Sequence, residues 1–168
     1  MTNKIIEIEN ILRVNNFTIT CAESCTGGLI ASKITQNSGS SAIFRGSIVT
    51  YCNEIKEQEL NVKKETMIKY GVVSCEVVDE MLIGVIKKFN ADYAIAISGV
   101  AGPNGGTKNK PVGTVVIGVL SSLNHNNTQV YNFDGNRKDI QIQAAKTALK
   151  IVFNILNKNS WQLKKNLL

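Results

Sequence analysis

Apolar residues recur along this chain at two spacings, one typical of helices and the other of buried strands. Near the start, Ile5, Ile8 and Leu12 are three and four positions apart, which predicts a first helix. The same periodicity predicts helices over about residues 28–37, 53–60, 63–70, 75–89 and 137–157. Ser74 is the expected N-cap of the helix at 75–89, and Gly71 is expected to end the helix before it.

Two further segments, residues 93–97 and 115–120, are near-continuous apolar runs. A run without alternation is typical of a strand that helices cover on both faces. Other strands are expected at residues 17–22, 46–52 and 128–133, the last after a hairpin turn at 124–127. Helices that alternate with such strands predict an α/β fold: a single three-layer α/β/α domain with a mixed, largely buried sheet.

Length and composition agree with one soluble domain. The chain has 168 residues, of which 43% are hydrophobic and 19% are charged. We expect the domain to occupy residues 1–158 and a C-terminal tail to occupy residues 159–168. The chain opens without an apolar leader, and no apolar run is long enough for a membrane span, so a cytoplasmic protein without membrane contact is expected.

The net charge of +6 comes mainly from lysines that are spread along the chain. Single-stranded nucleic acid is bound by basic grooves with interleaved aromatic residues, and no such run occurs here. We therefore expect no nucleic-acid partner, only a mild attraction for small anionic molecules.

Metal and cofactor sites are not predicted. The four cysteines, Cys21, Cys25, Cys52 and Cys75, form no C-x-x-C pair. The single histidine, His125, lies among asparagines in the expected turn, where it is interpreted as a solvated loop residue. Free thiols are also consistent with a reducing compartment.

The segment AESCTGG, residues 22–28, joins an expected strand to an expected helix. Ser24 in this segment would lie where backbone N–H groups are unpaired and the helix dipole is positive. Such a junction can hold an anion, or the oxyanion formed when a hydroxyl attacks a carbonyl. Gly27 and Gly28 would let another molecule approach the backbone closely.

A nucleophilic serine needs a base, and histidine does not supply one here. A lysine whose pKa is lowered by burial can accept the proton instead. Tyr51 ends an expected strand and Lys56 falls in the first turns of the next helix, so both can point at one mouth of the sheet. The spacing alone also allows a non-catalytic arrangement, in which Tyr51 packs against other side chains and Lys56 is exposed to solvent.

Two more clusters suggest anion binding. The glycine-rich segment SGVAGPNGGT, residues 98–107, follows a buried strand and could form a nest for phosphate or carboxylate, although it matches neither a Walker A loop nor G-x-G-x-x-G. Arg137 lies in the first turn of the last helix, where the dipole favours anions, so a bound anion would explain its position. The alternatives are that the segment 98–107 is a tight connection that binds no ligand and that Arg137 is simply exposed to solvent.

Four segments together resemble the CinA C-terminal family: TCAESCTGG at residues 20–28, VTYCNEIK at 49–56, ISGVAGPNGG at 97–106 and KPVGTV at 110–115. The resemblance runs in order over about residues 3–157. It extends to the stand-alone members that are nicotinamide-nucleotide amidohydrolases. A molybdopterin-binding-like domain precedes this domain in some members and is not expected in these 168 residues.

The resemblance implies an amidohydrolase of the pyridine nucleotide cycle that converts nicotinamide mononucleotide (NMN) to nicotinate mononucleotide and ammonia. It implies Ser24 as nucleophile, Lys56 as base and Tyr51 as an assisting group, with no metal or cofactor and a small nucleotide as partner. Backbone N–H groups near residues 25–28 would hold the oxyanion. The expected substrate-binding residues are Cys25, Thr26, Gly27, Gly28, Asn53, Ser98, Gly99, Gly102, Asn104, Gly105, Gly106 and Arg137.

Two positions depart from the family pattern. Asn136 stands where members usually have Asp, and Gln141 stands where an arginine is common. Asn136 can still cap the last helix, but a missing cation could weaken phosphate binding. A non-catalytic nucleotide-binding or competence-associated regulatory module is therefore the alternative function. We also expect a homo-oligomer, with the tail around Trp161 and Leu163 as a candidate interface.

Overall fold

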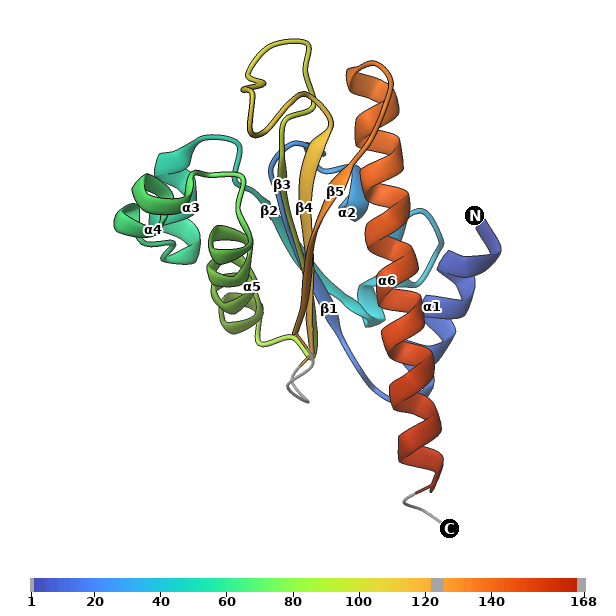
Figure 1. The fold of residues 1–168 in the computed structure, drawn as a ribbon. Coiled ribbons are helices and arrows are strands. Elements are labelled where there is room, and N and C mark those ends of the chain that lie inside the picture. Colours follow the sequence, from blue (N-terminus) through green and yellow to red (C-terminus); the bar gives the residue numbers. More distant parts are fainter. Residues whose placement is uncertain (1, 122–125, 166–168) are drawn as a thin grey trace.

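A mixed five-stranded sheet forms the centre of the fold in a computed structural model, which describes residues 2–121 and 126–165, with side chains from residue 4 to 158 (Figure 1). Its strand order is β2-β1-β3-β4-β5. Strand β1 pairs in parallel with β2 and β3, whereas β4 pairs antiparallel with β3 and β5. The strands are β1 (Ile19–Glu23), β2 (Phe44–Val49), β3 (Tyr93–Gly99), β4 (Thr114–Ser121) and β5 (Asn126–Asn132).

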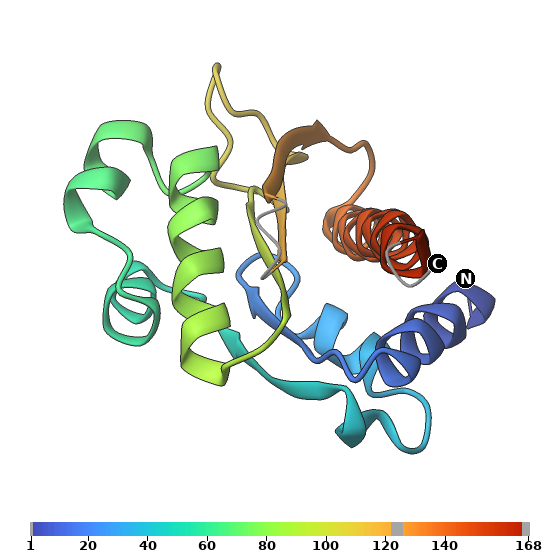
Figure 2. The ribbon, with the colours of Figure 1, turned by 90° about the horizontal axis from the view of Figure 1, so that it is seen from below.

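Helices cover both faces of this sheet, which confirms the predicted three layers (Figures 1 and 2). One face carries α1 (Thr2–Val14), α2 (Leu29–Ile34) and α6 (Arg137–Lys165), and the other carries α3 (Asn53–Leu60), α4 (Lys64–Tyr70) and α5 (Cys75–Phe89). A short 3₁₀ turn, Ser40–Ala42, precedes β2. None of the helices in the described ranges has the length and hydrophobicity that a membrane crossing requires.

The sheet separates two hydrophobic cores. Ile95 of β3 packs on the side of α6, whereas its neighbours Ala94 and Ala96 pack on the side of α5. Both sides of β3 and β4 are buried, which is why their sequences lack alternation. Gly118 lets α5 approach closely, because a Cβ atom there would lie 2.7 Å from Leu82 Cδ1.

The predicted N-cap of α5 and the predicted end of α4 are confirmed. The hydroxyl oxygen of Ser74 accepts a hydrogen bond from the Val77 N–H at 3.3 Å and caps α5. Gly71 ends α4 with a φ of 78°. The expected exposed position of His125 lies outside the described residues.

Some element ends differ from the prediction. Strand β2 ends at Val49; Thr50 still donates its N–H to the carbonyl of Glu23 at 2.7 Å, and α3 begins at Asn53. Tyr51 therefore follows the strand rather than ending it. Helix α6 continues to Lys165, beyond the expected helix end at about residue 157. The expected interface around Trp161 and Leu163 concerns side chains that lie outside the described ones.

Three parallel strands end at one edge of the sheet. Glu23 of β1 pairs with Val49 of β2 and with Ile97 of β3, so the segments after these strands lie side by side. Figure 1 shows the loop between β3 and β4 and the start of α6 at the same end. Carboxyl ends of parallel strands are the usual position of ligand sites in α/β folds.

Candidate active site

A cavity of about 280 Å³ lies at this end of the sheet, and we call it the Ser24 cleft. The structure brings together there all three residues expected to be catalytic and eight expected to bind substrate. The lining residues are Ser24, Cys25, Tyr51, Asn53, Lys56, Val72, Val73, Ser98, Gly99, Val100, Ala101, Gly102, Asn104, Gly105 and Arg137. Of these, Val72, Val73, Val100 and Ala101 were not expected from the sequence.

Lys56 is buried beside Ser24. Helix α3 begins at Asn53, shortly after the end of β2 at Val49, and directs Lys56 into the protein. Lys56 is therefore only 2% exposed. Its Nζ donates a hydrogen bond to the Thr50 carbonyl at 2.8 Å and lies 3.5 Å from the Ser24 Oγ. The structure therefore places an amine within reach of a hydroxyl, as the nucleophile-base hypothesis requires.

Burial lowers the pKa of Lys56, because an ammonium ion loses its hydration inside the protein. Nearby Cys52, Cys25 and Glu54 raise this pKa, but they do so less than burial lowers it. No carboxylate forms an ion pair with Lys56 among the described residues. A lysine with such a pKa can act as a proton acceptor.

Cys25 is the neighbouring nucleophilic side chain in the same cleft. Burial, with a further contribution from the charge of Glu23, raises the pKa of Cys25 to about 12. The thiolate is the reactive form of cysteine, and it is not populated at neutral pH with this pKa. The raised pKa argues against a thiolate at Cys25, and the position of the Lys56 amine, 3.5 Å from the Ser24 Oγ, favours Ser24 as the nucleophile.

The carboxylate of Glu23 occupies the N-terminus of α2. It accepts hydrogen bonds from the N–H groups of Gly28 at 3.1 Å, Ile30 at 3.1 Å and Ala31 at 2.8 Å, and its side chain is fully buried. The expectation that the N–H groups of this junction are unpaired is wrong for these three. Glu23 was missed from the sequence, although a carboxylate just before a helix start is a recognisable signal.

Two other N–H groups in the turn, those of Cys25 and Thr26, donate to no other residue that the structure describes. The N–H of Ser24 donates to the Ile97 carbonyl, and that of Gly27 donates to the Ser24 carbonyl. Cys25 and Thr26 are therefore the candidate donors for an oxyanion formed at Ser24.

Arg137 joins three segments at the rim of the cleft. Its Nη1 donates to the Gly102 carbonyl at 2.8 Å, and its Nη2 donates to the hydroxyl oxygen of Tyr51. Tyr51 is 61% exposed, and it is held by Arg137 rather than by Lys56 or Ser24. The structure thus places Tyr51 where it can contact a ligand at the entrance of the cleft.

The start of α6 is well capped despite its departure from the family pattern. The Asn136 side-chain oxygen accepts from the N–H of Lys138 at 2.9 Å and of Asp139 at 3.2 Å. In return, the Asp139 carboxylate accepts from the Asn136 N–H at 3.1 Å. The predicted cap at Asn136 is confirmed.

Gln141 contacts the turn that carries Ser24. Its Nε2 donates a hydrogen bond to the Cys25 carbonyl at 2.7 Å. From the sequence, only the absence of a cation at this position was expected to matter. The available signal was its spacing, because a residue four positions after Arg137 lies on the same helix face.

Some expected binding residues do not line the Ser24 cleft. Thr26, Gly27 and Gly28 line a neighbouring hollow of about 420 Å³. Gly106 packs against Val112, whose backbone nitrogen would lie 2.9 Å from a Cβ atom at position 106. Ser98 lines the cleft, but its hydroxyl donates to the Val72 carbonyl at 2.8 Å.

Comparison with known proteins shows the family of this chain. The CinA C-terminal domain model matches residues 2–156. The nicotinamide-nucleotide amidohydrolase PncC of Enterobacter agglomerans is 44% identical over 154 residues, which cover 92% of this chain and 94% of that protein. A CinA-like protein of Prochlorococcus marinus (strain AS9601) is 47% identical over 151 residues, which cover 89% of this chain. The match covers 36% of that relative, so the chain spans about a third of the length of such CinA-like proteins.

Solved structures show the same fold. The competence/damage inducible protein CihA from Agrobacterium tumefaciens superimposes with a TM-score of 0.89 at 33% identity, over 93% of this chain and 94% of that one. A CinA superfamily protein from Klebsiella pneumoniae also gives a TM-score of 0.89, at 32% identity, over 94% of this chain and 98% of that one.

Proposed function

Because this chain belongs to the CinA C-terminal domain family, we propose that it is an amidohydrolase that converts NMN and water to nicotinate mononucleotide and ammonia. The PncC relative is named for this class of substrate, and the match covers nearly its whole length. The observation that carries the proposal is the buried amine of Lys56, 3.5 Å from the Ser24 hydroxyl. We also propose that this reaction takes place in the cytoplasm and serves pyridine nucleotide salvage.

In the first half of the proposed reaction, the Ser24 Oγ attacks the carboxamide carbon of the nicotinamide ring. Neutral Lys56 accepts the hydroxyl proton as the new C–O bond forms. The carbonyl oxygen becomes an oxyanion, which the N–H groups of Cys25 and Thr26 stabilise. The Lys56 ammonium then returns its proton to the amide nitrogen, the C–N bond breaks and ammonia leaves.

An ester between Ser24 and the nicotinoyl group remains after this step. Water attacks the ester carbon while Lys56 takes a proton from it, and the second oxyanion forms at the same position. The C–O bond to Ser24 breaks, Lys56 returns the proton to Oγ, and nicotinate mononucleotide is released. The Thr50 carbonyl orients Lys56 through both halves, because it accepts one of the amine hydrogens at 2.8 Å.

The test is incubation of the purified protein with NMN, with ammonia and nicotinate mononucleotide measured separately. We expect both products in equal amounts. Ser24→Ala should release neither, while Ser41→Ala, an exposed serine before β2, should behave as the unmodified protein. NMN that binds the unmodified protein without any turnover would favour the non-catalytic nucleotide-binding module instead.

A further inference from the structure

Strand β5 forms one outer edge of the sheet, and β4 is its only strand partner in the described ranges (Figure 2). Directly after β5, Phe133 donates its N–H to the Gly113 carbonyl, so the residues of β5 with odd numbers bond to β4. The residues with even numbers therefore direct their N–H and C=O groups away from the sheet. These residues are Asn126, Thr128, Val130 and Asn132.

The β5 edge lacks the features that usually prevent a sheet from pairing with another strand. Such features are charged side chains, proline and bulges. The seven residues of β5 include no charged residue and no proline, and their ladder with β4 is regular. The opposite edge differs, because the ladder between β1 and β2 skips the exposed Arg45, which forms a bulge. Of the two edges, that of β5 is the one open to a further strand.

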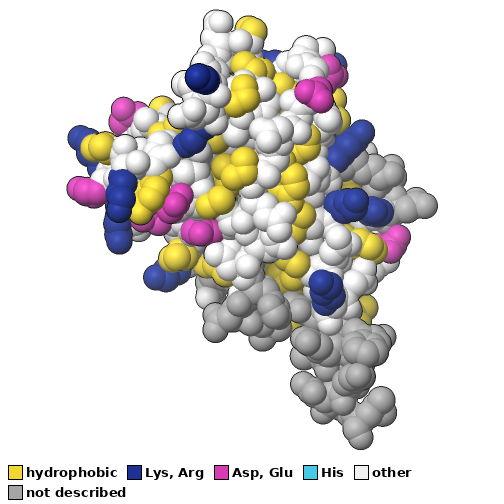
Figure 3. Space-filling view, viewed as in Figure 1, with side chains coloured by type: hydrophobic (Ala, Val, Ile, Leu, Met, Phe, Trp, Pro, Cys, Tyr) yellow, Lys and Arg dark blue, Asp and Glu magenta, His cyan; other side chains and the backbone are white. Residues whose placement is uncertain are grey.

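The surface around this edge has the composition of a protein interface. Figure 3 views the molecule from the side of β5: hydrophobic side chains gather in the middle of this face, and charged side chains lie toward its outline. Val130 contributes to the exposed apolar surface, since it is 54% exposed. A centre without charges inside a polar rim is typical of surfaces that bind another protein.

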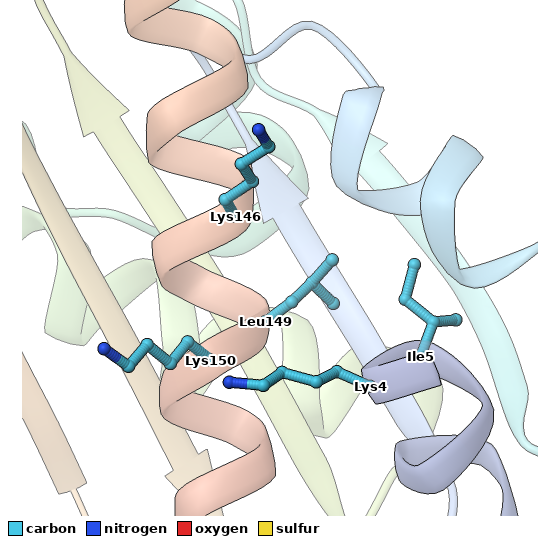
Figure 4. A pocket seen from close by; sticks show the side chains of 5 residues that line it. All are labelled: Lys4, Ile5, Lys146, Leu149 and Lys150. Carbon is cyan, nitrogen blue, oxygen red and sulfur yellow. The ribbon is translucent and has the colours of Figure 1, made fainter. Parts of the chain in front are cut away.

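The hollow between α1 and α6 is a weaker candidate for contact between two copies. Figure 4 shows Lys4 of α1 with Lys146 and Lys150 of α6 around this hollow, which has a volume of about 290 Å³. A two-fold axis through this surface would bring the lysines of two copies together, and like charges repel. Self-association there is therefore disfavoured, whereas the uncharged β5 edge presents no such repulsion.

We propose that the β5 edge pairs with the β5 edge of a second copy of this chain, antiparallel about a two-fold axis, so that one sheet runs through both copies. The register that pairs the whole strand places the axis at Gln129 and sets Thr128 opposite Val130 of the second copy. Residues with even numbers then face each other, so each outward N–H meets an outward carbonyl. Opposed β-branched side chains also favour this register.

A second copy is favoured over an unrelated strand because the open edge is the same on both copies. One two-fold operation therefore covers both edges and leaves neither exposed. The inference goes beyond the proposed amidase reaction and does not depend on it.

Sedimentation equilibrium tests the assembly, and we expect the purified chain to have twice the mass of one copy. Val130→Lys places two positive charges diagonally across the axis, about 7–8 Å apart, and should raise the dissociation constant of the dimer about tenfold or more. Val14→Lys is the matched control, because it makes the same change at an 80% exposed position at the end of α1. It should leave the dissociation constant unchanged.

Two results of this experiment would overturn the inference. An unmodified chain that is monomeric would leave the edge to an extended segment of another protein. An equal weakening of the dimer by Val130→Lys and Val14→Lys would show an effect of net charge alone.

Amide hydrogen exchange measures the pairing at single residues. The N–H of Thr128 donates to no residue of the same copy in the described ranges, so it should exchange rapidly in a monomer and slowly in the proposed dimer. Val130→Lys should remove this protection. The N–H of Gln129 is directed toward β4 and should stay protected in both proteins, which shows that the variant remains folded. Rapid exchange at Thr128 in a chain that is nevertheless dimeric would place the interface elsewhere.

Discussion

The side-chain amide of Gln141 donates a hydrogen bond of 2.7 Å to the carbonyl of Cys25, the residue directly after Ser24. The N–H of Ser24 itself donates to the Ile97 carbonyl of β3 at 3.1 Å. The turn that carries Ser24 is therefore held from one side by α6 and from the other by the sheet. This arrangement is expected to keep the Ser24 hydroxyl and the N–H groups of Cys25 and Thr26 in a fixed relation.

Replacing Gln141 by Leu should lower kcat for NMN by about tenfold with little change in KM, because the turn loses one of its two supports. The free energy of unfolding should fall by about 1 kcal/mol. Gln143→Leu is a matched control, since Gln143 on the same helix donates a hydrogen bond of the same length to the Asp134 carbonyl. That variant should keep its kcat; an equal loss of kcat in both variants would contradict a positioning role for Gln141.

Replacing Lys56 by Met should lower kcat by about 10²–10⁴-fold, the usual contribution of a general base. Stability should stay the same or increase, because the variant no longer buries an amine without an acidic partner. Thermal unfolding and steady-state kinetics of the same preparation check both points. Lys87→Met, at an exposed position of α5, is the control. Retained turnover in Lys56→Met would place the base elsewhere.

The lowered pKa of Lys56 predicts a pH dependence of activity. The reactive form is the neutral amine, so kcat/KM should rise with pH and level off above an apparent pKa below the usual lysine value of about 10.4. A profile that falls over the same range would contradict this role.

Stability should follow the same titration. Between the lowered folded pKa and the unfolded pKa, the unfolded chain binds more protons than the folded protein. The free energy of unfolding should therefore gain a favourable contribution as pH rises through this window, and Lys56→Met should lack it. Urea unfolding of the two proteins at several pH values measures the difference.

Replacing Glu23 by Ala should lower the free energy of unfolding by more than about 3 kcal/mol. The change leaves the N–H groups of Gly28, Ile30 and Ala31 without their acceptor in a buried place. Urea denaturation measures the loss, and Glu65→Ala in the exposed first turn of α4 is the control. A similar small effect of both variants would show that the carboxylate does not support α2.

The architecture was largely readable from the sequence. Continuous apolar runs located the central strands β3 and β4, and helical apolar spacing located the long helices α5 and α6, because the apolar pattern reflects which faces of an element are buried. The predicted bounds of the short elements were less accurate. Strand β2 lies at the edge of the sheet and ends where its single partner strand ends, which the sequence of residues 46–52 does not reveal.

The candidate site was readable in part. Three motifs follow three strands, and the parallel order of β2, β1 and β3 brings the ends of those strands to one edge. The sequence did not reveal that Thr26, Gly27 and Gly28 face a different hollow from Ser24. It also gave no sign that Arg137 binds Tyr51, because these residues are 86 positions apart.

The amino-acid sequence by itself determined the layers, the order of helices and strands, and the segments that carry polar groups to one end of the sheet. Tertiary structure decided which of those groups meet. Lys56 is buried beside Ser24, and Glu23 rather than a ligand fills the start of α2. The physical reason is that periodicity is a local property of the chain, whereas the desolvation and partners of a polar side chain depend on segments that only folding brings together.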